Sequence, residues 1–228
     1  MTDIKLEILF DEVLRYIGYK EDIHVISDDM KQSIKKNIDI VKNNISLRSL
    51  ASNVINIEEI DNCIVAGDVL KLPGKDIKAH LKNCYGIIVM GVTLGNEVDT
   101  LIRRTEIINM SDAVILDAAC NVAIEEYSKI CEEDIRNNIM KDNKYLTMRY
   151  SPGYGDLPID IQDELVKIID GGRKIGLYVT PSHIMIPRKS ITSIMGVANI
   201  EVKGKMAGCS NCVMNKKCIY KKRGTTCV

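Results

Sequence analysis

The run GIIVMGV, residues 86–92, is the longest apolar stretch of the chain and decides how the fold is interpreted. Its length, its β-branched residues and the glycine at its start are typical of a buried β-strand. The run is far too short to cross a bilayer as a helix. We therefore expect this segment to be a buried strand of the core.

Helical and extended patterns lie on both sides of this strand. Apolar spacing predicts helices at residues 6–17, 28–41, 75–82, 96–104, 112–130 and 160–169. Short apolar runs predict strands at 54–57, 63–65, 145–149 and 175–180, and a pair at 190–197 and 200–203 around a turn at Gly196. Residues 134–143 are polar and are expected to be an exposed connection. Gly171 and Gly172 are expected to end the helix before them.

This mixture of elements predicts an α+β fold with a mostly antiparallel sheet and helices clustered around it. The order of elements lacks the regular strand–helix alternation of a Rossmann fold. The turn GVTLG at residues 91–95 also lacks the GxGxxG spacing of a dinucleotide site.

Composition limits the possible functions. Hydrophobic residues make up 46% of the 228 residues, but one Phe and no Trp leave Ile, Val, Leu and Met to fill the core. The 31 basic and 31 acidic side chains cancel, so the charge balance points to no nucleic acid and no anionic membrane. The N-terminus shows no signal-peptide pattern, and we expect a soluble, cytoplasmic protein. We assign residues 1–205 to one domain and 206–228 to a Cys-rich, basic tail.

The sequence RYSPGYGD, residues 149–156, combines side chains that suit a ligand site, and we call it the arginine loop. Arg149 offers a planar, two-point grip on a carboxylate. Tyr150 and Tyr154 can stack on a flat ring or donate a hydroxyl hydrogen bond. A proline stiffens the segment, and two glycines let the backbone approach a ligand closely. A purely structural interpretation is also open, since Asp156 looks like the N-cap of the next helix.

The arginine loop resembles the RxxxGY signature of the activation (reactivation) domain of cobalamin-dependent methionine synthase. Arg149, Gly153 and Tyr154 stand at the fixed positions of that signature. Three other segments resemble the same family in order and spacing. They are the strand and Thr-Leu-Gly turn at 86–95, the Leu-Asp-Ala-Ala sequence of a helix at 116–119, and the Met-x-Pro-x-x-Ser segment at 185–190.

The resemblance implies a curved antiparallel sheet with helical groups around it, and binding of S-adenosylmethionine. The family uses this methyl donor to remethylate cobalamin that has been oxidised to the inactive Co(II) state. By the family's pattern, Arg149 holds the ligand carboxylate, and the backbone at Ser151 and Gly153 meets adenine or ribose. Tyr154 contacts the sulfonium or the amino-acid end. We expect no catalytic acid–base pair, because a sulfonium is already a good leaving group and the nucleophile is reduced cobalt on another polypeptide.

Two further roles follow from the resemblance. An acidic residue near the N-terminus binds the ligand ammonium, and Glu7 and Asp11 are both candidates; the alternative is a solvated carboxylate on a helix. Asp117 is the candidate for a carboxylate that meets the histidine released from cobalt, although stabilisation at a helix N-terminus explains it equally simply. His183 is expected to be a surface residue or to lie behind the site. The histidines are dispersed and lack metal-ligand spacing: His24, His80 and His183.

Four cysteines crowd the C-terminus, three of them in C-x2-C-x5-C spacing: Cys209, Cys212, Cys218 and Cys227. This pattern suits zinc or an iron–sulfur cluster, while free thiols and disulfides are open alternatives. The basic residues of the tail form either a solvated face or a docking site for an acidic electron donor such as a flavodoxin. The remaining cysteines are expected to be reduced core thiols: Cys63, Cys84, Cys120 and Cys131.

Together these observations predict a subunit for reductive reactivation of cob(II)alamin in a split methionine synthase. Such a subunit is a methyltransferase component that needs a cobalamin-carrying partner, since the sequence has no DxHxxG-type cobalamin-binding motif. The alternative is a ligand-sensing or metal-binding adaptor, possessing zinc or an iron–sulfur cluster, of another corrinoid methyl-transfer system.

Overall fold

A computed structural model describes residues 6–19, 24–67 and 70–202. The chain separates into two compact units, each made from three stretches. Unit 1 comprises Met1–Leu50, Gly91–Glu133 and Asp170–Ile191, and unit 2 comprises Ala51–Met90, Asp134–Ile169 and Thr192–Val228. The predicted division at residues 205 and 206 falls outside the described residues and stays a prediction. Among the helices of the described residues, none has the length and apolar character to traverse a lipid bilayer.

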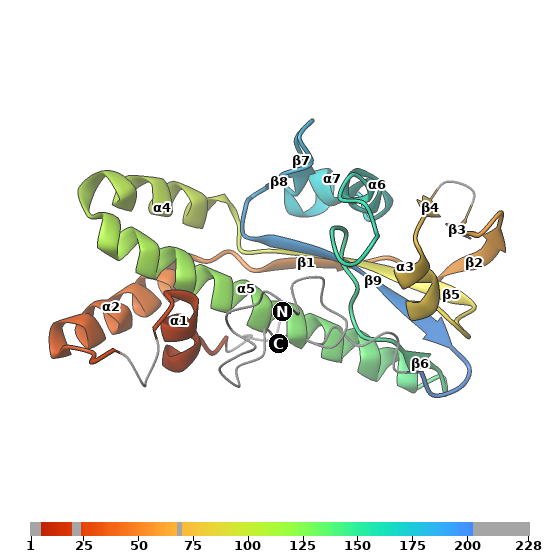
Figure 1. The fold of residues 1–228 in the computed structure, drawn as a ribbon, viewed down its shortest axis with the longest axis horizontal. Helices are drawn as coiled ribbons and strands as arrows, with labels where there is room; N and C mark the ends of the chain where they lie inside the picture. The colour runs from red at the N-terminus through yellow and green to blue at the C-terminus, as the bar shows by residue number, and fades with distance from the viewer. Residues whose placement is uncertain (1–5, 20–23, 68–69, 203–228) are drawn as a thin grey trace. The chain divides into compact units, whose positions relative to one another are not determined.

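Unit 1 is dominated by helices. They are α1 (Phe10–Tyr16), α2 (Asp28–Asn44), α4 (Asn96–Ile108), most of α5 (Met110–Met140) and the short α7 (Gly171–Ile175). Helix α1 contacts α2, and α2 contacts α4 (Figure 1). The predicted start of α2 is confirmed, because the Ser27 hydroxyl accepts a hydrogen bond from the Met30 N–H at 3.2 Å. The same unit holds the hairpin of β7 (Tyr178–Val179) and β8 (Met185–Ile186).

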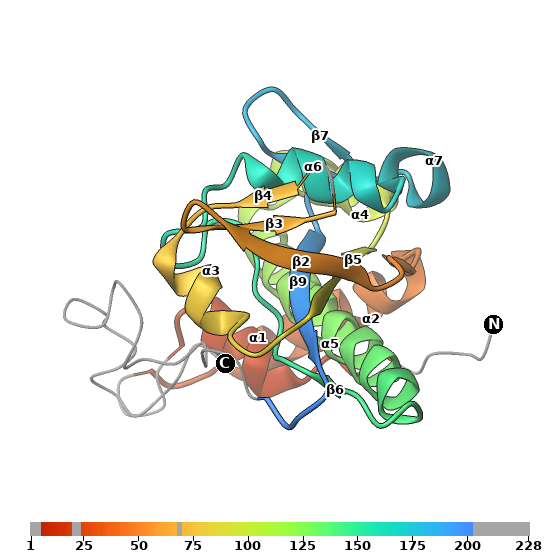
Figure 2. The same ribbon diagram turned by 90° about the vertical axis from the view of Figure 1, so that its right-hand side faces the viewer.

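Unit 2 is built from antiparallel strands and short helices. Its complete elements are β2 (Ile55–Ile60), β3 (Cys63–Ala66), β4 (Leu70–Leu72), α3 (Lys75–His80), β6 (Tyr145–Leu146) and α6 (Ile161–Ile168). Strands β2 and β3 form a hairpin whose turn residues, Asp61 and Asn62, both have the positive φ of a type I′ turn. Figure 2 shows β4, β3 and β2 as neighbouring ribbons, with α3 next to them.

Strands β5 (Gly86–Thr93) and β9 (Ser190–Ala198) each belong partly to both units. In the described residues, seven strands form an open sheet in the order β4-β3-β2-β5-β9-β6, and β1 (Arg48–Ala51) pairs with β5 beside this path. Every residue of β5 is buried, which confirms the strand predicted from the GIIVMGV run. The registers of β2–β3, β2–β5, β3–β4 and β6–β9 are antiparallel. The predicted α+β class is therefore confirmed.

The end of α5 differs from the sequence prediction. The helix continues to Met140, so the exposed connection predicted for residues 134–143 is wrong over most of its length. Ile135 and Ile139 stand at i, i+4 spacing and are half-buried, so they continue one apolar face of the helix, while the exposed Asn137 and Asn138 lie on its solvent-facing side. Arg136 attaches these last turns to the chain that follows, because its guanidinium donates to the Leu146 carbonyl and, at 3.1 Å, to the Thr147 carbonyl.

Predictions that rested on glycines are also wrong. Gly196 lies inside β9 rather than in a turn, and residues 200–202 form no second strand. A Cβ at Gly196 would approach Cys84 Sγ at 2.5 Å and Leu81 Cδ2 at 2.9 Å, so close packing explains the glycine. Gly171 begins α7 instead of ending the preceding helix, and α7 and β7 replace the longer strand predicted after it.

The packing around Gly196 predicts a stability effect. Gly196→Val should lower the free energy of unfolding by about 1–3 kcal/mol, because the added atoms overlap the Cys84 and Leu81 side chains. Urea unfolding followed by circular dichroism measures the change. Gly18→Asn is a matched control, since a Cβ at Gly18 meets no atom within 4 Å and Asn tolerates its φ of 80°. A Gly196→Val protein as stable as the control would contradict this explanation of the residue.

Candidate functional site

The arginine loop lies in unit 2 and is attached to β9 where it begins. The strand predicted for residues 145–149 is confirmed only at Tyr145–Leu146. Beyond that point the pairing continues irregularly, with the Thr147 N–H donating to the Gly196 carbonyl at 2.9 Å. Tyr150 then forms an isolated antiparallel bridge with Ile194, through hydrogen bonds of 2.9 and 2.8 Å between their backbones.

The rest of the loop is folded into turns by its own backbone. The Gly153 N–H donates to the Leu157 carbonyl at 2.9 Å, and the Leu157 N–H donates to the Tyr154 carbonyl at 3.0 Å. The Tyr154 N–H donates to the Ser151 carbonyl at 3.2 Å. Gly153 has a φ of 86°, which residues other than glycine rarely adopt. The loop therefore has a defined conformation that depends on glycine at this position.

Tyr150 is the buried anchor of the loop. Its ring lies 4.9 Å from the His80 ring, and its hydroxyl donates to the Tyr154 carbonyl at 3.2 Å. Burial raises the pKa of Tyr150 to about 12, with further contributions from the nearby carboxylates of Asp76 and Asp156. The phenol therefore keeps its proton at physiological pH and remains a hydrogen-bond donor.

Asp156, at the end of the loop, caps a helix other than the one predicted. Its carboxylate accepts hydrogen bonds from the Lys75 N–H at 2.6 Å and the Asp76 N–H at 3.0 Å, at the start of α3. The prediction that it caps the following helix is wrong, because α6 begins only at Ile161. No local sequence pattern indicates this contact, since the partners stand about eighty positions earlier in the chain.

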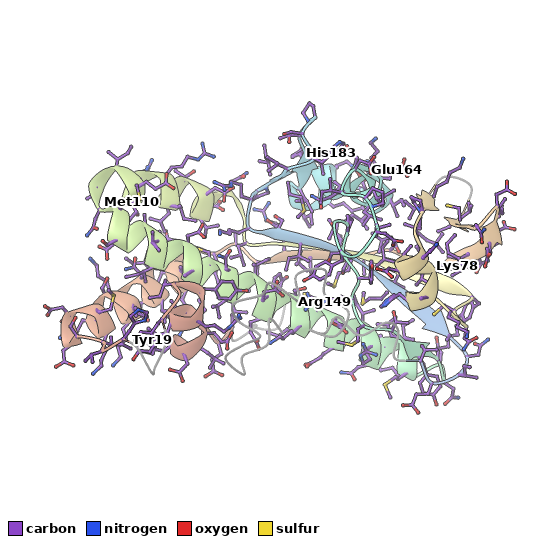
Figure 3. The ribbon with its side chains drawn as sticks, viewed as in Figure 1. Tyr19, Lys78, Met110, Arg149, Glu164 and His183 are labelled. Carbon is purple, nitrogen blue, oxygen red and sulfur yellow. The ribbon has the colours of Figure 1, made fainter. Side chains whose placement is uncertain are left out.

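Arg149 and Tyr154 are the loop side chains best suited to a ligand. Arg149 is half-buried and lies on the segment that follows β6, where Figure 3 labels it. A partly desolvated guanidinium binds a carboxylate more strongly than a fully exposed one does. Tyr154 is 58% exposed, and its ring centroid lies 6.3 Å from that of Tyr150. The loop thus presents a cation, an exposed aromatic ring and a shaped backbone within a few residues.

Two other family-like segments meet in unit 1. The Leu94 N–H donates to the Lys189 carbonyl at 3.0 Å, and the Ser190 hydroxyl donates to the Thr93 hydroxyl at 2.8 Å. The Arg188 N–H donates to the buried carboxylate of Asp99 at 2.7 Å. The Thr-Leu-Gly turn after β5 and the Met-x-Pro-x-x-Ser segment are therefore joined directly.

Asp117 belongs to the same region of unit 1 and is paired with a lysine. Lys189 Nζ lies 2.7 Å from Asp117 Oδ1, and it also donates to Asn121 Oδ1 at 2.7 Å. The Asn121 amide donates to Asp117 Oδ2 at 3.2 Å. The helix-terminus explanation for Asp117 is wrong, because α5 starts at Met110 and the helix-dipole effect fades within the first turn. The sequence analysis identified neither partner. Asn121 stands at i, i+4 helical spacing from Asp117, but Lys189 is far away in the sequence.

The remaining predicted positions are not among the partners in the contacts described above. Glu7 is exposed ahead of α1, and Asp11 is exposed in its first turn, both in unit 1. His183 lies in the β7–β8 turn with a φ of 59°. Cys209, Cys212, Cys218 and Cys227 lie outside the described residues. Within residues 6–19, 24–67 and 70–202, no group of three or more His, Cys, Asp or Glu side chains could hold a metal ion. The cysteines described there are free thiols: Cys63, Cys84, Cys120 and Cys131.

Comparison with known proteins places this geometry in context. Residues 115–204 match the family described as "Vitamin B12 dependent methionine synthase, activation domain". One similar solved structure is the "Crystal Structure of the MetH Reactivation Domain bound to AdoHcy". The similarity covers 95% of this chain and 80% of that chain, with a TM-score of 0.61 and 13% sequence identity, and it shows a shared fold. No curated protein matches this chain.

Proposed function

We propose that this chain, whose residues 115–204 match the activation-domain family of vitamin B12 dependent methionine synthase, is a subunit that binds S-adenosylmethionine for reactivation of cobalamin. The methyl acceptor is cobalt, reduced from Co(II), on a separate cobalamin-carrying subunit of a split methionine synthase. The chain then acts as a methyltransferase component that is inactive without this partner.

The observation that carries the proposal is the arginine loop, whose groups match the ligand's chemistry. The Arg149 guanidinium suits the carboxylate of S-adenosylmethionine, with a charge-assisted pair contributing about 1.5–3 kcal/mol. The N–H groups of Gly153 and Tyr154 are already used within the loop. The proposed backbone contacts are therefore the carbonyl oxygens of Ser151 and Gly153, which suit donors such as the adenine amino group and the ribose hydroxyls. The Ser151 carbonyl already accepts from the Tyr154 N–H, and its second lone pair can accept from the ligand. The exposed ring of Tyr154 suits the region of the sulfonium.

The proposed chemistry asks the protein to bind and orient, rather than to move a proton. The sulfonium carries its own leaving group, so methyl transfer needs no general base. A one-electron donor such as a flavodoxin would reduce Co(II) of the partner's cobalamin to Co(I), and the methyl group would then pass from sulfur to cobalt, leaving S-adenosylhomocysteine. Arg149 and Tyr154 hold the donor during this step. Correct placement of the two reactants is the main source of rate acceleration.

Other residues have proposed roles outside the loop. Glu7 or Asp11 binds the ligand ammonium. Asp117, held by Lys189 and partly exposed at 44% of its side chain, contacts the cobalamin-carrying subunit. The cysteines of the tail bind zinc or an iron–sulfur cluster, and its basic residues dock an acidic electron donor such as a flavodoxin. The second candidate function, an adaptor of another corrinoid system, rests on those cysteines. It predicts a metal-containing protein that does not bind S-adenosylmethionine.

Isothermal titration with S-adenosylmethionine tests the proposal directly. We expect one ligand to bind per chain without any added subunit, because the loop supplies the main contacts from a single unit. S-adenosylhomocysteine should also bind, since it keeps the carboxylate and adenosine, whereas adenosine should bind far more weakly. If neither S-adenosylmethionine nor S-adenosylhomocysteine binds, the proposal is contradicted and the adaptor function is favoured.

A further inference from the structure

We propose that His80 is a positioning residue for the arginine loop, and that α3 acts as a splint holding both ends of this loop. The inference rests on the proposed function, because the loop is the proposed S-adenosylmethionine site. Helix α3 lies outside residues 115–204, so the family match assigns it no role. Figure 3 labels Lys78 on this helix and Arg149 on the loop.

His80 holds the beginning of the loop through a hydrogen bond from its buried ring. It is the last residue of α3 and is only 1% exposed. Its Nε2 lies 3.0 Å from the Met148 carbonyl oxygen and 3.0 Å from Thr147 Oγ1. A carbonyl oxygen accepts hydrogen bonds, so the geometry assigns a hydrogen to Nε2. The Met148 carbonyl and the Arg149 N–H share one rigid peptide plane, and the histidine therefore fixes the direction in which Arg149 leaves the backbone.

Thr147 makes the contact with His80 specific. Its hydroxyl donates to the Met148 carbonyl at 3.0 Å and accepts from the Gly196 N–H at 2.8 Å. The hydroxyl thereby connects the histidine, the first peptide of the loop and strand β9. Buried polar groups in such a network are costly to leave unpaired, so the network favours a single arrangement of the chain.

The His80 ring extends this control to the middle of the loop. Its centroid lies 4.9 Å from that of the Tyr150 ring, within the range of interacting aromatic pairs, and the two planes are tilted by 48°. The Tyr150 hydroxyl then donates to the Tyr154 carbonyl at 3.2 Å. A continuous series of contacts therefore runs from His80 through Tyr150 to the residue proposed to meet the sulfonium.

The first residues of α3 hold the far end of the loop. The Asp156 carboxylate accepts from the Lys75 and Asp76 N–H groups. Between the two anchors, Gly155 has no room for a side chain: a Cβ there would overlap the Asp76 carboxylate and lie 2.5 Å from the Tyr150 hydroxyl. Six residues of helix thus fix the start, the middle and the end of the loop.

Three substitutions at His80 separate its hydrogen bond from its bulk. His80→Phe keeps a ring beside Tyr150 but removes the donor, and it should weaken S-adenosylmethionine binding about three- to tenfold. His80→Gln places an amide donor near the position of Nε2 and should bind within about threefold of the original protein. His80→Asn carries the same amide one bond shorter and should bind as poorly as His80→Phe. His24→Gln, at an exposed histidine, is the control and should leave affinity unchanged.

Two measurements on the His80 variants test this proposal. Calorimetric titration gives the affinities, and hydrogen exchange without ligand follows the Tyr150 and Gly153 amides, which bond to Ile194 and Leu157. Faster exchange at both amides in His80→Phe and His80→Asn, with recovery in His80→Gln, supports the splint. Equal affinities and equal exchange in all three variants would overturn it. If the original protein binds no S-adenosylmethionine while the exchange pattern holds, the proposed function fails and the splint stands.

Discussion

Arg149→Ala should weaken S-adenosylmethionine binding by a factor of about thirty to several thousand. Removing one partner of a desolvated, charge-assisted pair typically costs about 2–5 kcal/mol, and each 1.4 kcal/mol corresponds to about tenfold in affinity. Arg149 is half-buried, so water replaces the lost contact incompletely. Arg149→Lys should also bind poorly, because an ammonium cannot reproduce the planar, two-point grip. Isothermal titration of both variants measures these losses.

Thermal melts without ligand separate this prediction from a structural role. If Arg149 mainly pinned the loop to the protein, the melting temperature would fall and affinity would change only in proportion. Adenosine supplies a second control, since it lacks the carboxylate and its weak binding should be nearly unaffected by Arg149→Ala. Near-native affinity in a folded Arg149→Ala protein would remove this residue from the proposed site.

The sequence was most informative where one local pattern determines the structure. The apolar run in β5 has the length and residue types of a buried strand, and every one of its residues is buried. The start of α2 could be predicted at residue 28 because an N-cap such as Ser27 acts on residues only two or three positions further along. The arginine loop was identified as a candidate site because its unusual residues are adjacent in the sequence.

Contacts between distant segments could not be predicted in this way. Asp156 satisfies the preference of an aspartate for helix N-termini, but nothing in its neighbourhood shows that the helix is α3 rather than α6. His80 carries no mark of its role, because its partners become neighbours only when α3 folds beside the loop. Lys189 likewise meets Asp117 only in the folded chain. Glycine was ambiguous for a related reason, since a turn and a crowded strand such as β9 at Gly196 both select it.

The chain alone should form no methionine from S-adenosylmethionine and homocysteine, whereas addition of a cobalamin-carrying subunit and a low-potential reductant should permit methyl transfer. The proposed site holds only the methyl donor, and the sequence contains no DxHxxG-type motif for the acceptor's cofactor. The visible spectrum of the partner's cobalamin follows the conversion from the Co(II) to the methylated form. Methionine formation by the isolated chain would contradict the proposed division of roles.

Asp117 supplies the variant that separates binding from turnover in this assay. Asp117→Asn removes a charge next to Lys189, and Asp117 is not among the residues proposed to contact S-adenosylmethionine. Its affinity for S-adenosylmethionine should therefore match that of the original protein, while methylation of the partner's cobalamin slows about tenfold or more, as expected for loss of one charge-assisted contact. Glu126→Gln is a matched control, because Glu126 lies on the same helix and also pairs with a lysine, Lys129, but at the longer distance of 3.6 Å and with a lysine that is more exposed than Lys189. Equal turnover by Asp117→Asn and Glu126→Gln would show that Asp117 serves only to hold Lys189 in the fold.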